Sequence, residues 1–108
     1  MLENGGNTDV ALSLAQSAHA HAPKVATIED TLAWAYYHKG LYKMSIVLLQ
    51  DALKAEPDNA PYHYHIGLAY SKLGDVLQAK LHFQRALVMD PKSSQADLVR
   101  KELQQLGG

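Results

Sequence analysis

Apolar residues recur along most of the chain at intervals of three and four, the spacing that places them on one side of an α-helix. The clearest segment is 42–55, in which Ile46, Leu49 and Leu53 fall on one face between polar residues. Glycine or proline follows most of these segments, as expected where a helix ends. The pattern predicts a series of helices at Thr8–His21, Ala26–Lys39, Tyr42–Ala55, Ala60–Leu73, Val76–Met89 and Ser94–Leu106.

The sequence also repeats itself at an offset of 34 residues. Four columns agree in three successive units, one of glycine, two of small residues and one of proline. They are Gly6, Gly40 and Gly74; Ala11, Ser45 and Ala79; Ala18, Ala52 and Ala86; and Pro23, Pro57 and Pro91. Small residues let neighbouring helix axes approach closely. Because no unit could bury its apolar stripe alone, each must stack on the next, which predicts a solenoid.

These residues resemble the tetratricopeptide repeat, a helix-turn-helix unit of the same length with glycine, alanine, aromatic and proline residues at set positions. Residues 60–93 match best, through Ile66, Gly67, Tyr70, Gly74, Ala79, Phe83, Ala86 and Pro91, with His63 where the family often has Trp. Residues 26–59 match through Leu32, Ala33, Tyr36, Gly40, Ser45, Leu49, Ala52 and Pro57. The resemblance implies an all-α, right-handed superhelical solenoid of antiparallel helix pairs, with about six helices.

The resemblance divides one domain, residues 1–108, into four parts. Residues 1–25 form the second half of a truncated repeat, 26–59 and 60–93 are full repeats, and 94–106 form a capping helix. We therefore expect the chain to be the carboxy-terminal part of a longer array. A finer resemblance is to the end of long bacterial repeat proteins associated with exosortase-type export and exopolysaccharide systems. It rests on the stretches LENGGNTDVALSLAQ, DTLAWAYYHKG and PYHYHIGLAYSKLGD. The sequence leaves the compartment, cytoplasmic or periplasmic, open.

Composition and motifs remove several classes of function. Ten basic and eleven acidic residues give a net charge of −1, so no basic face indicates nucleic acid and no cationic helix indicates a membrane. Without cysteine, the chain has no disulfide, thiolate nucleophile or cysteine-ligated zinc. The chain also lacks the nucleophile-elbow, phosphate-loop and H-E-x-x-H motifs. We predict no enzymatic activity, no catalytic residue and no cofactor.

The concave side of the array is the candidate binding surface, because family geometry implies that the first helix of each pair lines it. Aromatic side chains bury large areas at low rotamer cost and often anchor a protein partner. The predicted groove residues are Thr27, Asp30, Trp34, Tyr37 and His38 from the first full repeat and Tyr64, His65, Leu68, Ser71 and Lys72 from the second. The alternative is that Trp34 and Tyr37 only pack between adjacent helices.

One ligand mode of the family can be compared by position. Members that clamp a carboxy-terminal carboxylate use Lys and Asn on one first helix, Asn on the next, and Lys and Arg on the third. The matching positions here hold Asp30, Trp34, His65, Gln95 and Val99. A carboxylate would meet Asp30 where it needs a cation. We expect instead a neutral, partly apolar protein or peptide segment, with neither nucleic acid nor membrane insertion.

His63 and His65 raise the question of a metal site. Residues two apart on a helix point about 200° away from each other, so these two rings cannot face one metal. A helical zinc pair needs a spacing of three or four, which no two histidines here have. We expect His63 at the seam against a second helix and His65 on the groove side, and we predict no metal site.

These patterns indicate a non-catalytic interaction module or scaffold that binds a peptide or protein segment in its concave groove. The alternative is structural, with repeats from separate chains stacked end to end as a homo-oligomer. It rests on Val10 and Leu14 of the first helix, whose apolar side lacks the cover of a preceding helix.

Overall fold

The computed structural model describes residues 3–22 and 24–107, with side chains from residue 9 onward. The described residues form six helices and no strand. The helices are α1 (Glu3–His21), α2 (Ala26–His38), α3 (Tyr42–Ala55), α4 (Ala60–Lys72), α5 (Val76–Met89) and α6 (Ser94–Gln105). The predicted all-α fold is therefore confirmed.

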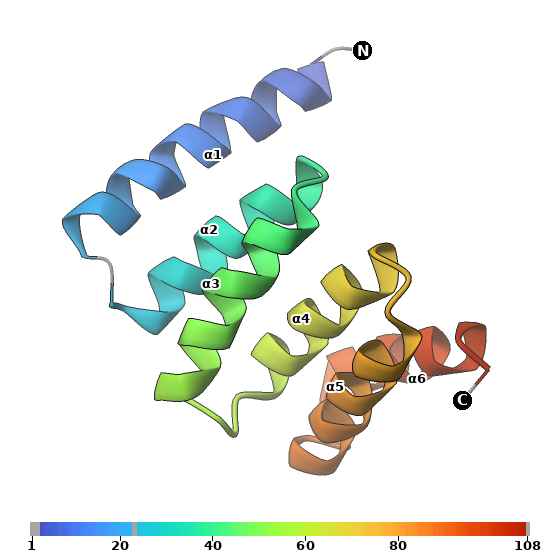
Figure 1. The fold of residues 1–108 in the computed structure, drawn as a ribbon. Coiled ribbons are helices and arrows are strands. Elements are labelled where there is room, and N and C mark those ends of the chain that lie inside the picture. Colours follow the sequence, from blue (N-terminus) through green and yellow to red (C-terminus); the bar gives the residue numbers. More distant parts are fainter. Residues whose placement is uncertain (1–2, 23, 108) are drawn as a thin grey trace.

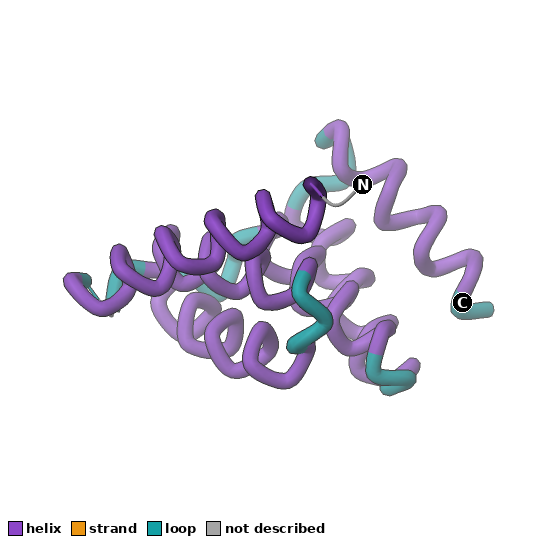
Figure 2. The backbone as a smooth tube through the Cα atoms, turned by 90° about the horizontal axis from the view of Figure 1, so that it is seen from above, coloured by secondary structure: helices purple, strands orange, loops and turns teal. Residues whose placement is uncertain are grey.

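The helices form a layered array in which each one packs chiefly against the helices before and after it. Figure 1 shows them in chain order from α1 at the top to α5 and α6 at the lower right, with α2 and α3, then α4 and α5, as antiparallel pairs. Figure 2, seen from above, shows the helix that carries the C label lying at one side of the array. This arrangement is a helical-repeat solenoid.

The helix ends follow from the local sequence. Gly40 and Gly74 follow the ends of α2 and α4 and have φ values of 84° and 81°, which glycine adopts at no steric cost. Gly6, aligned with them in the repeat, instead lies inside α1, which begins at Glu3 rather than at the predicted Thr8. Glycine tolerates helical backbone angles at a cost of about 1 kcal/mol relative to alanine. It therefore ends a helix only where the neighbouring residues also favour a helix end. Pro23 lies outside the described residues.

Side-chain caps begin the last three helices. The Asn59 side-chain oxygen accepts from the Tyr62 backbone N–H at 3.0 Å, and Asp75 caps α5 in the same way through Gln78 at 3.2 Å. Ser93 accepts from the backbone N–H of Ala96 at the start of α6. Each cap satisfies a donor that the first turn of a helix leaves without an intrahelical partner.

Three buried clusters hold the array together, one at each step of the stack. The first joins α1 to α2 through Ala15, Leu32 and Tyr36. The second joins α2, α3 and α4 through Ala26, Ala33, Ile46, Leu49, Ala52, Tyr62, Ile66 and Ala69. The third joins α4, α5 and α6 through Leu68, Ala79, Phe83, Ala86, Val99 and Leu103. None of the described helices is both long and apolar enough to cross a bilayer.

Candidate functional site

An aromatic cluster joins the two first helices of the full repeats. Trp34 on α2 stacks on His65 of α4, with ring centroids 4.4 Å apart and an interplanar angle of 29°. Its ring also stacks on Tyr37, at 5.0 Å and 3°. His38 meets the same indole edge-on at 4.7 Å. Trp34 is therefore the centre of a cluster that spans the contact between α2 and α4.

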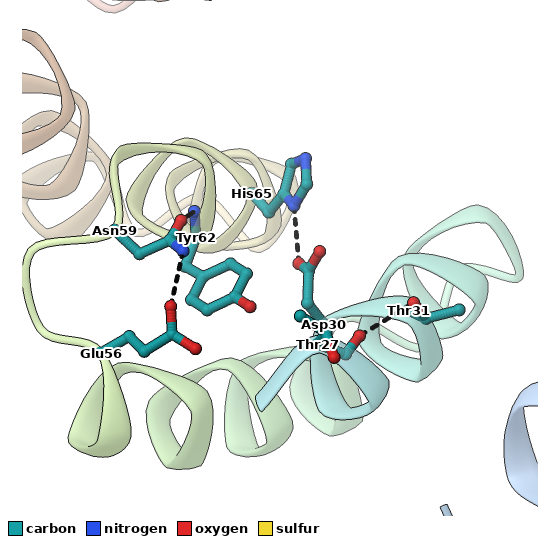
Figure 3. Close-up of polar contacts among 7 residues, drawn as sticks. All are labelled: Thr27, Asp30, Thr31, Glu56, Asn59, Tyr62 and His65. Atoms are coloured by element: carbon teal, nitrogen blue, oxygen red, sulfur yellow. Dashed lines mark hydrogen bonds and ion pairs between the residues drawn. The ribbon is translucent and has the colours of Figure 1, made fainter. Parts of the chain in front are cut away.

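A hydrogen bond beneath this cluster fixes its geometry. Figure 3 shows His65 on α4 directed at Asp30 on α2. The distance from His65 Nδ1 to Asp30 Oδ1 is 2.7 Å, and both side chains are half-buried. Because a carboxylate only accepts, the ring nitrogen donates. The bond ties the two first helices together and holds the imidazole in place for Trp34.

The predicted groove residues differ in exposure. Thr27, His38 and Lys72 are exposed, whereas Leu68 is buried in the third core cluster. The others are half-buried: Asp30, Trp34, Tyr37, Tyr64, His65 and Ser71. Trp34, Tyr37 and Tyr64 also pack against the cluster that includes Val99 and Leu103 of α6. These aromatic rings thus pack against the core on one side and are partly exposed to solvent on the other. The role of the groove as a binding surface stays a prediction.

The phenol groups on this side are held neutral. Burial raises the pKa of Tyr37, and the nearby Tyr42 phenol and Glu102 carboxylate raise it further. Burial, followed by the charge of Glu102, likewise raises the pKa of Tyr64. Both hydroxyl groups therefore remain hydrogen-bond donors at physiological pH. Glu102 belongs to α6, so the last helix contributes negative charge on this side of the aromatic cluster.

The positions that would clamp a carboxylate have other roles in this structure. Asp30 accepts the hydrogen bond from His65. Val99 is 1% exposed and lies in the core. Neither position offers a cation to an anionic ligand.

His63 and His65 point in different directions, as their spacing predicts. His63 is 4% exposed and lies at the seam with α5. Its Nε2 is 2.8 Å from the Pro57 carbonyl oxygen, and its Nδ1 is 2.9 Å from His82 Nδ1. Over the described side chains, no group of three His, Asp or Glu residues is placed to hold a metal ion.

The contact between His63 and His82 is a feature that the sequence analysis missed. Burial, then the neighbouring His63 and Arg85, lowers the pKa of His82 to about 4, so this ring is neutral at physiological pH. The repeat register held a usable signal, because His63 faces the second helix of its own pair and His82 lies on that helix. Helical spacing within one segment does not reveal such a contact between segments.

Two models of one family match the chain. The model described as a TPR repeat matches residues 33–74, and the tetratricopeptide repeat model matches residues 60–93. Together they cover more than half of the chain. Tetratricopeptide repeat protein 37 of Xenopus laevis is 33% identical over 99 residues, which take in 84% of this chain and 6% of that protein. The chain thus spans a small part of that relative's length.

Solved structures share the fold. The first TPR domain of Spaghetti, bound to an HSP90 peptide, superposes with a TM-score of 0.84 at 17% identity, over 96% of this chain and 80% of that one. The Yersinia enterocolitica secretion chaperone SycD, with a peptide of the translocator YopD, gives 0.83 at 12% identity, over 97% and 83%.

At such identities the likeness concerns the fold alone. The finer resemblance to bacterial export-associated arrays and the division into repeats at 25, 59 and 93 stay predictions. The repeat register, the six stacked helices and the two matching family models agree. The chain belongs to the tetratricopeptide repeat family.

Proposed function

We propose that this chain is a non-catalytic protein-interaction module that binds a peptide or protein segment on its concave side. The observation that carries the proposal is the half-buried Trp34 ring, stacked on Tyr37 and on His65 of the neighbouring first helix. Rigid aromatic faces of this kind supply contact area at low entropic cost. The Spaghetti domain and SycD, which share the fold, each hold a peptide in their structures.

The chemistry of the cluster favours a neutral and partly apolar ligand segment. Asp30 is engaged by His65, and Glu102 adds negative charge near Tyr37 and Tyr64. A carboxylate would be repelled there, whereas an apolar side chain would gain contact with the indole and phenol rings. The two phenol hydroxyls could donate to backbone carbonyls of the bound segment.

The test compares capture of a partner from a native lysate by the wild type and by a Trp34→Ala, Tyr64→Ala double variant. A Val88→Ala variant serves as the matched control, because Val88 is 81% exposed on the second helix of its pair. We expect a partner that the wild type and the control hold and that a still-folded double variant loses. Equal capture by all three proteins would contradict the concave site. Melting followed by circular dichroism checks that each variant is folded.

A second candidate, end-to-end assembly, is supported by exposed apolar residues on α1. Val10 is 60% exposed and Leu14 67%. A second copy could cover them, as one repeat covers the next within the chain. Light scattering over a concentration series tests this proposal: mass should rise with concentration, and a Val10→Gln, Leu14→Gln variant should stay monomeric. A constant monomer mass for the wild type would refute it.

A further inference from the structure

A cavity of about 450 Å³ lies between the second helices α3 and α5, over α4. Its volume falls within the range of small-molecule sites, roughly 300–1,000 Å³. Leu53, Ile66 and Met89 supply apolar surface from all three helices. The cavity shares no lining residue with the Trp34 cluster, so it is separate from the site proposed above.

One wall of this cavity is a stack of rings. Tyr70 lies parallel to His82, with centroids 5.7 Å apart and an angle of 8° between the planes. His82 in turn stacks on His63, at 5.2 Å and 25°. Because the Pro57 carbonyl only accepts, His63 donates to it from Nε2. When both rings are neutral, His63 Nδ1 accepts from His82 Nδ1, which fixes the orientation of His82.

The second distinctive feature of the cavity is the positive charge of its lining. Lys54 and Arg85 line it, and no Asp or Glu does. Among the described side chains, Lys54 forms one long, exposed contact of 3.8 Å to Asp51, and Arg85 forms no ion pair. Arg85 lines the same cavity as His82, and its charge contributes to the lowered pKa of that ring. A cation next to a flat ring surface suits a planar anion.

The corresponding groove one repeat earlier differs in charge. Tyr36 accepts a hydrogen bond from Gln16 there, as Tyr70 does from Gln50 in the second groove, so the two grooves share a framework. At the Arg85 position, however, the earlier repeat has Asp51, and in the hollow there Asp51 and Glu29 are balanced by Lys24 and Lys54. The stacked helices alone therefore do not produce the basic character of the second cavity. It results from Arg85 of the second full repeat, together with Lys54 of the first and the lack of a carboxylate in the lining.

We propose that this cavity binds a small organic carboxylate with a flat apolar body. The carboxylate lies between Arg85 and Lys54, where charge-assisted hydrogen bonds hold it. The body covers the Tyr70–His82 wall and the Ile66 side chain. The neutral His82 ring offers this body an uncharged face.

The test is a titration with 2-naphthoate, followed by amide chemical shifts, with the uncharged 2-naphthamide as the matched probe. We expect saturable shifts in α3, α4 and α5 for naphthoate and at least about tenfold weaker binding of the amide. Arg85→Asp, which installs the residue of the preceding repeat, should also weaken naphthoate binding at least tenfold. Lys43→Asp makes the same change in net charge outside the cavity and should leave the affinity within about twofold.

Two further measurements separate this site from a general apolar surface. A bound carboxylate offsets the charge of Arg85, so the imidazole titration of His82 should move to higher pH in the complex. A Trp34→Ala variant should retain naphthoate affinity, because the concave cluster is not part of the cavity. Lys54→Gln should weaken binding as well, which gives a second variant if Arg85→Asp melts early. Equal binding of acid and amide, no saturable binding at millimolar concentration, or unchanged affinity in both cavity variants would overturn the proposal.

Discussion

Replacing Gly67 with alanine tests how closely α4 and α5 must approach. Phe83 is fully buried and its ring faces Gly67. A Cβ at position 67 would lie 2.6 Å from Phe83 Cε1 and 2.7 Å from Cδ1, inside any normal carbon–carbon contact. These are ring atoms in the packed core, so relief requires a shift of the ring or of the helix.

Two opposing effects decide the sign of this change. Alanine gains about 1 kcal/mol over glycine in a helix interior. Overpacking a dense core costs about 1–3 kcal/mol, and contacts this short favour the upper end of that range. The expected net loss is therefore about 2 kcal/mol. For a domain of this size, that corresponds to a fall in Tm of roughly 10 °C.

The preceding repeat shows how a larger residue at the glycine position can be accommodated by a smaller one at the facing position. One repeat earlier, the equivalent positions hold Ala33 and Leu49, both buried to 1% exposure or less. A Gly67→Ala, Phe83→Leu double variant should thus recover most of the stability that Gly67→Ala loses. A double-mutant cycle measured by urea unfolding should give a favourable coupling energy of about 1–2 kcal/mol. If Gly67→Ala melted at or above the wild-type temperature, the close approach would not be the reason for glycine at this position.

Three further changes follow from single contacts. Because His82 has a folded-state pKa of about 4, below its unfolded value near 6.5, its contribution to stability is complete above pH 6.5 and is lost as pH falls to 4. The loss should be about 1–2 kcal/mol after allowance for partial solvent access, and a His82→Leu variant should lack that pH dependence in chemical denaturation. Asn59→Ala should cost about 1 kcal/mol by removing the cap of α4, as measured by urea unfolding, whereas an unchanged midpoint would contradict the cap's role. Ser45→Ala should raise Tm by a few degrees, because the buried Ser45 hydroxyl has no partner among the described residues.

The helical pattern sufficed for the fold because its signals are local and repeat in register. Gly40 and Gly74 end helices where the sequence predicts, and small residues such as Gly67 occur where helices touch. The predicted start of the first helix at Thr8 was wrong, because the alignment alone cannot show whether a glycine such as Gly6 interrupts a helix or lies within it. Contacts between helices were also beyond the sequence. The bond from His65 to Asp30 joins residues 35 apart, and only the packed geometry brings them together.

The internal repeat separates what the fold requires from what this chain adds to it. The Gln50 and Tyr70 hydrogen bond has its counterpart in the preceding repeat, so it belongs to the stacking of helices. Arg85 and the contact between His63 and His82 have no such counterpart. The packing of α4 on α5 could be maintained by almost any apolar pair at the positions of His63 and His82. Helix stacking therefore requires neither the two hydrogen-bonded imidazoles nor the exposed cation Arg85 beside them. A ligand in the second groove would explain their presence, and the Arg85→Asp variant, which installs the acidic residue of the preceding repeat, tests that explanation directly. The Arg85→Asp variant should no longer bind the small carboxylate ligand, but it should retain the fold.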